Sequence, residues 1–106
     1  MSTGPILTHV TYIPKKGSED ELFKLVEIHW ATIHDLGLTT DEPAIVYKAT
    51  DKRSGAKSFI EIFSWKDEAA GDMAHQIPEV MAVWEPMGPL MEDLQLLKLD
   101  PVGVGA

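Results

Sequence analysis

Residues 59–70 read FIEIFSWKDEAA, and this stretch decides the fold because two periodicities meet in it. From Phe59 to Trp65 the residues alternate with a period of two, which is typical of a β-strand with two different faces. Asp67 and Glu68 follow directly, and acidic residues in the first turn of a helix interact favourably with the helix dipole. The stretch therefore predicts a strand that leads straight into a helix.

Upstream, the sequence predicts a strand over residues 6–13 and then a long helix. Ser18 and Glu21 form a capping-box pattern, in which each side chain satisfies an otherwise unpaired backbone N–H. Apolar positions then recur at helical spacing, and Gly37 stands where a left-handed residue commonly ends a helix. A second strand is predicted over 44–49, and the polar loop 51–55 joins it to a third strand over 58–64.

Downstream, Pro78 is expected to interrupt the helix that begins near Asp67, because proline lacks the N–H and clashes with the preceding turn. A further helical segment, with Val80 and Trp84 on its apolar stripe, is expected to stop near Pro86 and Pro89. A fourth strand is predicted over residues 94–99, and residues 100–106 are expected to be a tail without a core of its own.

The predicted element order is β-α-β-β-α-β, which indicates an α+β fold of the ferredoxin-like split type with a four-stranded antiparallel sheet. We expect one domain over residues 1–106, with both helices on one face of the sheet. The third strand nevertheless carries large apolar residues on both sides, with Phe59 and Phe63 on one and Ile60 and Ile62 on the other. The uncovered face therefore needs a partner, and a second copy in a homodimer is the simplest one.

Composition narrows the possible partners. The 106 residues include 17 acidic and 9 basic side chains, for a net charge of −8, and such a surface repels nucleic-acid phosphates and anionic membrane surfaces. The chain has no cysteine, which rules out thiolate chemistry and a disulfide framework. No apolar run approaches the roughly 20 residues of a membrane span, and we expect a cytoplasmic protein without a leader.

The element order, the run SWKDEAA at 64–70 and Ala74-His75 followed by Pro78-Glu79-Val80 resemble the dimeric α+β barrel superfamily over residues 6–99. Within it the chain resembles the antibiotic-biosynthesis-monooxygenase-like branch. The resemblance implies a dimeric α+β barrel. Members of this superfamily include cofactor-free oxygenases of aromatic polyketides, haem-degrading enzymes, isomerases and decarboxylases of small aromatics, and proteins of unknown role.

The haem-degrading branch requires an Asn on the first strand and a Trp and a His on the second helix. With Trp65-Lys66 aligned to the Trp-Lys step of that branch, Ala74 falls at the position of its helix Trp and Trp84 at the position of its His. The first strand offers Thr8 and His9 in place of Asn. The residues of that triad are therefore not present in this sequence.

His75 and Glu61 are the candidate catalytic residues. A neutral imidazole at the mouth of a pocket can take a proton from a phenol or hold a carbonyl oxygen, and His75 is placed for this role. Alternatively, it is a helix-end histidine that hydrogen-bonds a loop carbonyl across the break at Pro78. Glu61 stands between two phenylalanines on its strand face, so it either points into the barrel as a general base or faces solvent at an edge.

Four residues are candidates for substrate binding. Trp65 and Trp84 have flat rings that suit a planar ligand, although packing at a rim, at a dimer interface or in the core explains them equally well. Tyr47, like Tyr12, is a possible phenol donor to a substrate oxygen. His9 shares a strand face with Leu7 and Ile13, and the sequence does not decide whether that face meets the helices or the barrel cavity.

The remaining histidines indicate no metal site. His29 lies on the apolar stripe of the first helix, and we interpret it as a buried histidine with satisfied hydrogen bonds. His29 and His34 are five apart, not the three or four that place two imidazoles side by side on a helix. His9, Glu61 and His75 would form a metal site only if the fold brought them together.

The sequence contains no Gly-rich phosphate loop and no nucleophile elbow, so nucleotide cofactors and serine hydrolysis are disfavoured. Our first hypothesis is a cofactor-free monooxygenase, in which a base removes a proton from a small aromatic or hydrophobic molecule and the electron-rich anion then meets oxygen. The alternative is a non-catalytic, small-molecule-binding or stress-associated dimer. A haem- or metal-using member is the third reading.

Overall fold

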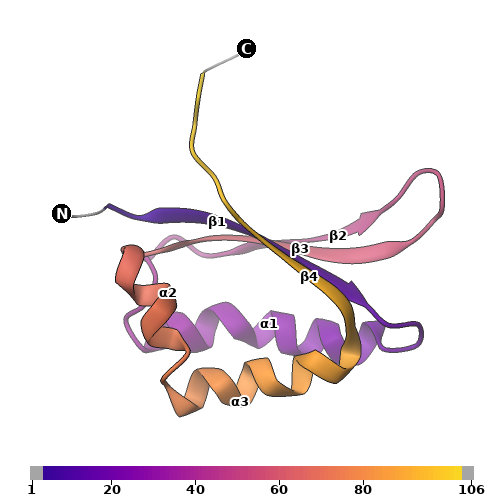
Figure 1. The fold of residues 1–106 in the computed structure, drawn as a ribbon, viewed down its shortest axis with the longest axis horizontal. Helices are drawn as coiled ribbons and strands as arrows, with labels where there is room; N and C mark the ends of the chain where they lie inside the picture. Colours follow the sequence, from indigo (N-terminus) through magenta and orange to yellow (C-terminus); the bar gives the residue numbers. More distant parts are fainter. Residues whose placement is uncertain (1–3, 104–106) are drawn as a thin grey trace.

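A computed structural model describes residues 4–103 of the chain. The elements follow in the order β1 (Ile6–Pro14), α1 (Glu19–Asp35), β2 (Ile45–Thr50), β3 (Lys57–Trp65), α2 (Glu68–Ala74), α3 (Pro78–Met87), a 3-10 turn (Gly88–Leu90) and β4 (Met91–Lys98). The strands form one antiparallel sheet in the order β2-β3-β1-β4, and the helices lie on one side of it (Figure 1). The predicted α+β, ferredoxin-like fold is confirmed.

The two sides of the sheet follow from the pairing of β1 with β3. Val10 pairs with Glu61 and Tyr12 with Phe59, and all four side chains are buried beneath the helices. The residues next to them point to the opposite side because successive side chains of a strand alternate, and there His9 pairs with Ile62 and Thr11 with Ile60. The predicted division of β3 into a phenylalanine face and an isoleucine face is therefore confirmed. The isoleucine side, which no helix covers, is called the open face below.

Helix α1 covers the sheet with a stripe of buried residues at helical spacing, namely Leu22, Val26, His29 and Ile33. Ser18 is its N-cap as predicted, but its side chain makes no capping hydrogen bond, so the predicted capping box is wrong. Gly37 has φ +75°, a left-handed conformation that glycine adopts without strain, and it follows the C-cap of the helix as predicted.

The second helical region is divided at Pro78, as predicted. Asp67 caps α2 by accepting a hydrogen bond from the backbone N–H of Ala70 at 3.0 Å, and Pro78 is the first residue of α3, where a missing N–H is tolerated. Helix α3 ends at Met87, between Pro86 and Pro89, which confirms the expected stop near these prolines. A proline so close to the end of a helix removes one backbone hydrogen bond and leaves few later turns to disturb.

The last strand is longer than the sequence indicated. We expected it over 94–99, whereas β4 begins at Met91, which pairs with Pro14 beyond a register shift between Ile13 and Pro14. The hydrogen bond from the N–H of Lys15 to the carbonyl of Leu90, at 2.8 Å, joins the same two segments. The predicted tail continues past β4 away from the sheet (Figure 1), and its residues 104–106 lie outside the described part of the chain.

The open face carries apolar side chains that water reaches. Ile45 and Tyr47 of β2 are about half exposed, at 53% and 52%, and Leu7 of β1 is 40% exposed. Their neighbours Ile60 and Ile62 on β3 extend the same apolar surface. Among the helices of residues 4–103, none has the length and apolar character needed to cross a membrane.

Two isoleucines of α1 test how the helix is held on the sheet. Ile33 is fully buried and Ile28 is 50% exposed, so the same substitution removes core packing at one position and surface contact at the other. We expect Ile33→Ala to lower the free energy of unfolding by about 2–5 kcal/mol and Ile28→Ala to lower it by less than about 1 kcal/mol. Urea unfolding followed by circular dichroism measures both, and equal losses would contradict the assigned core.

Candidate functional site

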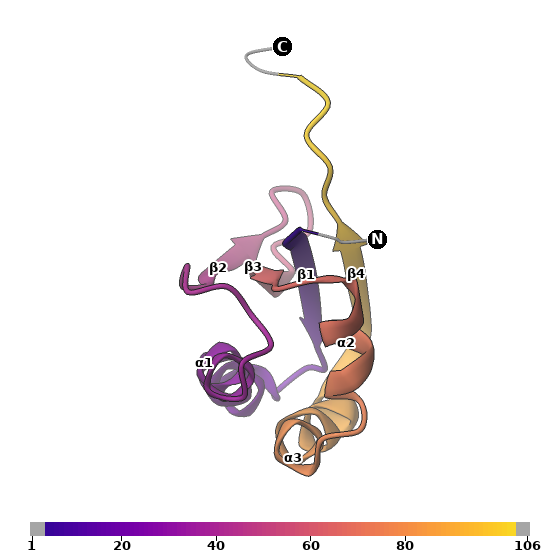
Figure 2. The same ribbon diagram turned by 90° about the vertical axis from the view of Figure 1, so that its left-hand side faces the viewer.

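A cavity of about 470 Å³ lies between the helix side of the sheet and the helices α2 and α3. It is placed on the β1 and β4 half of the sheet, whereas α1 lies below the β2 and β3 half (Figure 2). Its walls are mainly apolar and aromatic, with contributions from Val10, Phe63, Trp65, Trp84, Met87 and Leu96. Leu96 is 66% exposed although it lines the cavity, which shows that the cavity opens to solvent along β4.

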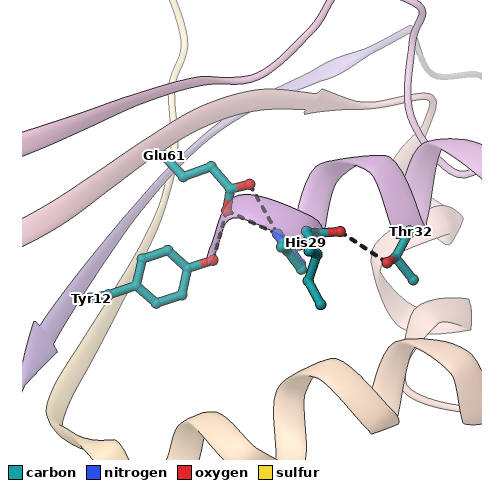
Figure 3. A network of polar contacts seen from close by, with 5 residues as sticks. Tyr12, His29, Thr32 and Glu61 are labelled. Carbon is teal, nitrogen blue, oxygen red and sulfur yellow. Dashed lines mark hydrogen bonds and ion pairs between the residues drawn. The ribbon is translucent and has the colours of Figure 1, made fainter. Parts of the chain in front are cut away.

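A chain of buried polar side chains connects β1, β3 and α1 at the inner wall. Glu61 is fully buried, and its Oε1 accepts a hydrogen bond of 2.6 Å from the Tyr12 hydroxyl. Nδ1 of His29 lies 2.9 Å from Oε1 and 3.0 Å from Oε2 of the same carboxylate. Figure 3 shows Tyr12 and His29 converging on Glu61 from two different elements. Tyr12 and His29 line the cavity, and Glu61 lies behind them.

These distances place two polar side chains on one buried carboxyl group. Tyr12 is the donor of its 2.6 Å contact, and a ring N–H placed nearly equally from both oxygens is the geometry in which His29 donates to a carboxylate. Burial, followed by the charge of Glu61 and the hydrogen bond to it, raises the pKa of Tyr12 far above its ordinary value. Tyr12 therefore stays protonated and holds Glu61 in place.

The other ring nitrogen of His29 is unoccupied. Its side chain is 4% exposed, and Nε2 is buried without a hydrogen-bond partner among the described residues. Because Nδ1 faces the Glu61 carboxylate, Nε2 is the ring nitrogen that is left for a ligand. The ring stands edge-on to Phe63, with centroids 5.8 Å apart, and 6.0 Å from the ring of Trp84. An imidazole nitrogen without a partner among the described residues is thus placed on the wall of an aromatic cavity.

The mouth of the cavity is more polar. His75 is the C-cap residue of α2 and is exposed, and its ring centroid lies 4.8 Å from that of Trp84. The hydrogen bond that we considered, from this ring to a loop carbonyl, is not found within residues 4–103. Carboxylates of α2 and its N-cap, including Asp67 and Asp72, share the mouth with Lys98 of β4.

The structure brings four of the six predicted site residues to this region. His75, Trp65 and Trp84 line the cavity, and Glu61 lies directly behind its inner wall. Trp65 also packs against Gly71, where a Cβ atom would meet its indole ring at 3.5 Å. The possibility that Glu61 faces solvent at a sheet edge is wrong, because its position in β3 points toward the helices between Phe59 and Phe63.

His9 and Tyr47 do not reach the cavity, and placing them with the other substrate-binding residues is wrong for this site. Tyr47 pairs with Ile60 and His9 pairs with Ile62, so the alternation of the strands turns both side chains to the open face. Convergence of His9 with Glu61 and His75 on a metal is excluded for the same reason. No group of three His, Asp or Glu side chains that could hold a metal ion is found within residues 4–103.

The residue that sequence reasoning missed is His29. Its burial was predicted, but the expectation that its hydrogen bonds are satisfied is only half correct, because Nε2 has no partner in the described part of the chain. The sequence pattern that could have identified it is one ionisable residue on each of two apolar faces. His29 lies on the apolar stripe of α1, and Glu61 lies on the phenylalanine face of β3. Two such residues on surfaces that pack together are expected to pair.

Comparison with known proteins supports the fold. No family model and no curated protein matches the chain, but solved structures do. Rv0793 from Mycobacterium tuberculosis superposes with a TM-score of 0.73 at 12% identity, over 97% of this chain and 100% of that chain. A structure described as an antibiotic biosynthesis monooxygenase superposes with a TM-score of 0.71 at 15% identity, over 92% of this chain and 99% of that one.

A third structure carries a more specific description. SnoaB from Streptomyces nogalater, described as a cofactor-independent oxygenase, superposes with a TM-score of 0.71 at 11% identity, over 95% of this chain and 96% of that chain. At these identities the likeness establishes a shared fold. The chain thus shares the α+β fold of these structures, which confirms the fold of the protomer expected from the resemblance.

Tyr12→Phe tests the buried polar chain, because it removes one donor to the Glu61 carboxylate and keeps the ring. A hydrogen bond to a buried charge contributes about 1.5–3 kcal/mol, and we expect a loss of this size near pH 8. The unfolded chain releases the tyrosine proton above about pH 10, whereas the folded protein keeps it because the pKa of Tyr12 is raised. The wild-type protein therefore loses stability relative to the variant by about 1.4 kcal/mol per pH unit above that point.

Urea unfolding of the wild-type protein and of Tyr12→Phe at about pH 8 and about pH 11 measures this difference. The gap between the two proteins is expected to narrow by about 1.4 kcal/mol at the higher pH. A gap that stays the same at both pH values would mean that Tyr12 ionises equally in the folded and unfolded protein.

Proposed function

We propose that the protein binds a small, largely apolar aromatic molecule in the cavity and oxygenates it without a cofactor. The observation that carries this proposal is an apolar cavity of about 470 Å³ with one imidazole on its inner wall and a second at its mouth. A volume of this size lies within the roughly 300–1,000 Å³ typical of small-molecule sites. The fold shared with a described cofactor-independent oxygenase supports the choice of reaction.

The walls favour a planar ligand. Phe63 and Trp65 meet edge to face with centroids 5.0 Å apart, and Trp84 lies across the cavity from them beside His75. Aromatic rings bind flat molecules by offset stacking and edge contacts, and their apolar surface excludes water from the bound molecule. A hydroxyl or activated C–H group of the ligand would then meet an imidazole with little competition from solvent.

The chemistry requires a substrate that reacts with oxygen once it has lost a proton. An imidazole accepts the proton, and the resulting carbanion or phenolate supplies the electrons that reduce dioxygen. When a methylene group is converted to a carbonyl, one oxygen atom enters the product and the other leaves as water, so substrate and dioxygen balance the reaction. The protein contributes positioning, proton acceptance and exclusion of water.

Anthrone is a suitable probe, because it is planar, apolar and acidic at its methylene group, and its oxygenated product is anthraquinone. We expect saturable quenching of tryptophan fluorescence, and consumption of one oxygen molecule per anthraquinone formed at a rate above that of the spontaneous reaction. An oxygen electrode and absorbance spectroscopy measure the turnover. His34→Gln, at a position that does not line the cavity, is the control and should change neither signal.

The outcomes separate the alternatives. Quenching without product would favour the non-catalytic binding protein, and absence of both signals would contradict the proposed function. His75→Ala tests the residue at the mouth, since full turnover in that variant would remove His75 as the proton acceptor and leave it at most a part of the wall.

We further propose that the open face pairs with the open face of a second copy to form the homodimer. Ile45, Tyr47 and Leu7 together expose a substantial apolar surface there, and such surfaces in proteins of this size are commonly interfaces. Sedimentation velocity is expected to show a dimer for the wild-type protein and a monomer for Ile45→Lys. Ile28→Lys, at a position on α1 with similar exposure, is the matched control and should remain dimeric. A monomeric wild-type protein would contradict this assignment.

A further inference from the structure

We propose that His29 is the catalytic base of the cavity and that its Nε2 accepts the proton of a ligand hydroxyl or an equally acidic group. Glu61 and Tyr12 act through it as positioning residues. The inference uses the cavity of the proposed function but concerns which atom receives the proton, and it assigns this role to a residue other than His75. Its geometry is shown in Figure 3, where Glu61 holds one side of the imidazole.

The first step is the orientation of the ring. Nδ1 of His29 lies within 3.0 Å of both carboxylate oxygens of Glu61, which fixes this nitrogen as the donor and fixes the plane of the ring. Tyr12 donates to the same carboxylate at 2.6 Å and thereby limits its rotation. A carboxylate behind an imidazole sets the tautomer and the direction in which the second nitrogen points, as in the aspartate–histidine pair of serine proteases.

The second step concerns Nε2. This atom is buried and has no hydrogen-bond partner within residues 4–103, and the residue that carries it is only 3% exposed and lines the cavity. A buried polar atom without a partner is unfavourable. The structure has four such atoms within residues 4–103, on His9, His29, Trp30 and Thr40, and of these residues His29 is the one that lines the cavity. A hydroxyl group that enters the cavity would supply the missing donor, while the rest of the ligand contacts Phe63 and Trp84.

The third step is the proton transfer. The O–H bond of the ligand breaks, the N–H bond at Nε2 forms, and the electron pair of the broken bond stays on the ligand oxygen. The imidazolium that results lies against the Glu61 carboxylate, which stabilises the new positive charge on a side chain that is only 4% exposed. Tyr12 does not compete for the role of acid, because burial and the charge of Glu61 raise its pKa.

His75 lacks this arrangement. It is exposed at the mouth of the cavity, its ring contact is with Trp84, and no carboxylate is found in hydrogen bond to its ring within residues 4–103. Water can therefore reach its nitrogens and compete with a ligand. The ring of His29 is held in place by Glu61 and is almost fully buried, and orientation and shielding from solvent are the two properties that a base in an apolar cavity requires.

The ring nitrogens of His29 can be observed directly by ¹⁵N–¹H correlation spectroscopy of the labelled protein. In the free protein we expect a protonated Nδ1 and an unprotonated Nε2, with the signal assigned by comparison with His34→Gln and the other single-histidine variants. Saturation with 2-naphthol should shift Nε2 toward the protonated form, whereas 2-methylnaphthalene, which has nearly the same shape but no hydroxyl, should leave it unprotonated. A proton on Nε2 in the free protein would overturn the proposal, even if no probe binds.

Affinities supply a second readout. The two probes have nearly the same shape, so the ratio of the dissociation constant of 2-methylnaphthalene to that of 2-naphthol measures the contribution of the hydroxyl group to binding. We expect this ratio to fall about tenfold in Glu61→Gln, because glutamine can donate to Nδ1 and so transfers the ring proton to Nε2. His34→Gln should keep the wild-type ratio. An unchanged ratio in Glu61→Gln, together with an unshifted Nε2 at saturation, would overturn the assignment of the base.

These readouts test two claims independently, namely that His29 accepts the proton and that the protein is an oxygenase. A protonation shift on naphthol binding without any oxygen consumption would uphold His29 as proton acceptor and contradict the oxygenase. Oxygen consumption with an unshifted Nε2 would uphold the oxygenase and overturn His29 as its base.

Discussion

A single buried carboxylate constrains this molecule more than any other group. Glu61 lies in the middle of the helix side of the sheet, fully removed from water, where an unpaired charge would be strongly destabilising. Its two donors come from different elements, Tyr12 from the neighbouring strand and His29 from α1. The pairing register of β1 with β3 and the position of α1 over the sheet must both be correct for these hydrogen bonds to form. The site and the fold therefore depend on the same contact.

The cavity follows from how unevenly the helices cover the sheet. Helix α1 is 17 residues long and packs a continuous stripe below β2 and β3, whereas the other side is covered by two short helices with a break at Pro78 (Figure 2). The break leaves space below β1 and β4, and large rings border it without filling it. His29 belongs to the long helix but lines the space beside the short ones. The proposed base of the cavity is therefore carried by the more firmly packed half of the molecule.

Much of the fold could be predicted from the sequence, because alternation in the strands and helical spacing in α1 are local signals. The division of residues 59–65 into two faces predicted which side chains of β3 share a surface. Which of the two faces the helices cover depends on packing across the whole sheet, and this is why the direction of His9 stayed open and Tyr47 was placed with the wrong group. The start of β4 was missed because pairing with β1 determines it.

The site was harder to predict than the fold, since its central pair joins residues 32 positions apart in the sequence. His75 attracted attention because it stands at the end of a helix in a stretch that resembles a family of enzymes, whereas His29 looked like an ordinary buried histidine. The distinction lies in one unpaired nitrogen atom, which no sequence pattern reports. Solved structures with the same fold, at 10–15% identity, likewise do not identify the residues that act in this chain.

The most direct test is a high-resolution crystal structure of the protein soaked with 2-naphthol. We expect the naphthol oxygen within about 2.6–3.2 Å of Nε2 of His29, with the ring system against Phe63 and Trp84 and with the Glu61 contact to Nδ1 intact. A naphthol oxygen bound to His75 with its rings outside the cavity, or a cavity closed by Trp84, would contradict the assignment of His29 as the base.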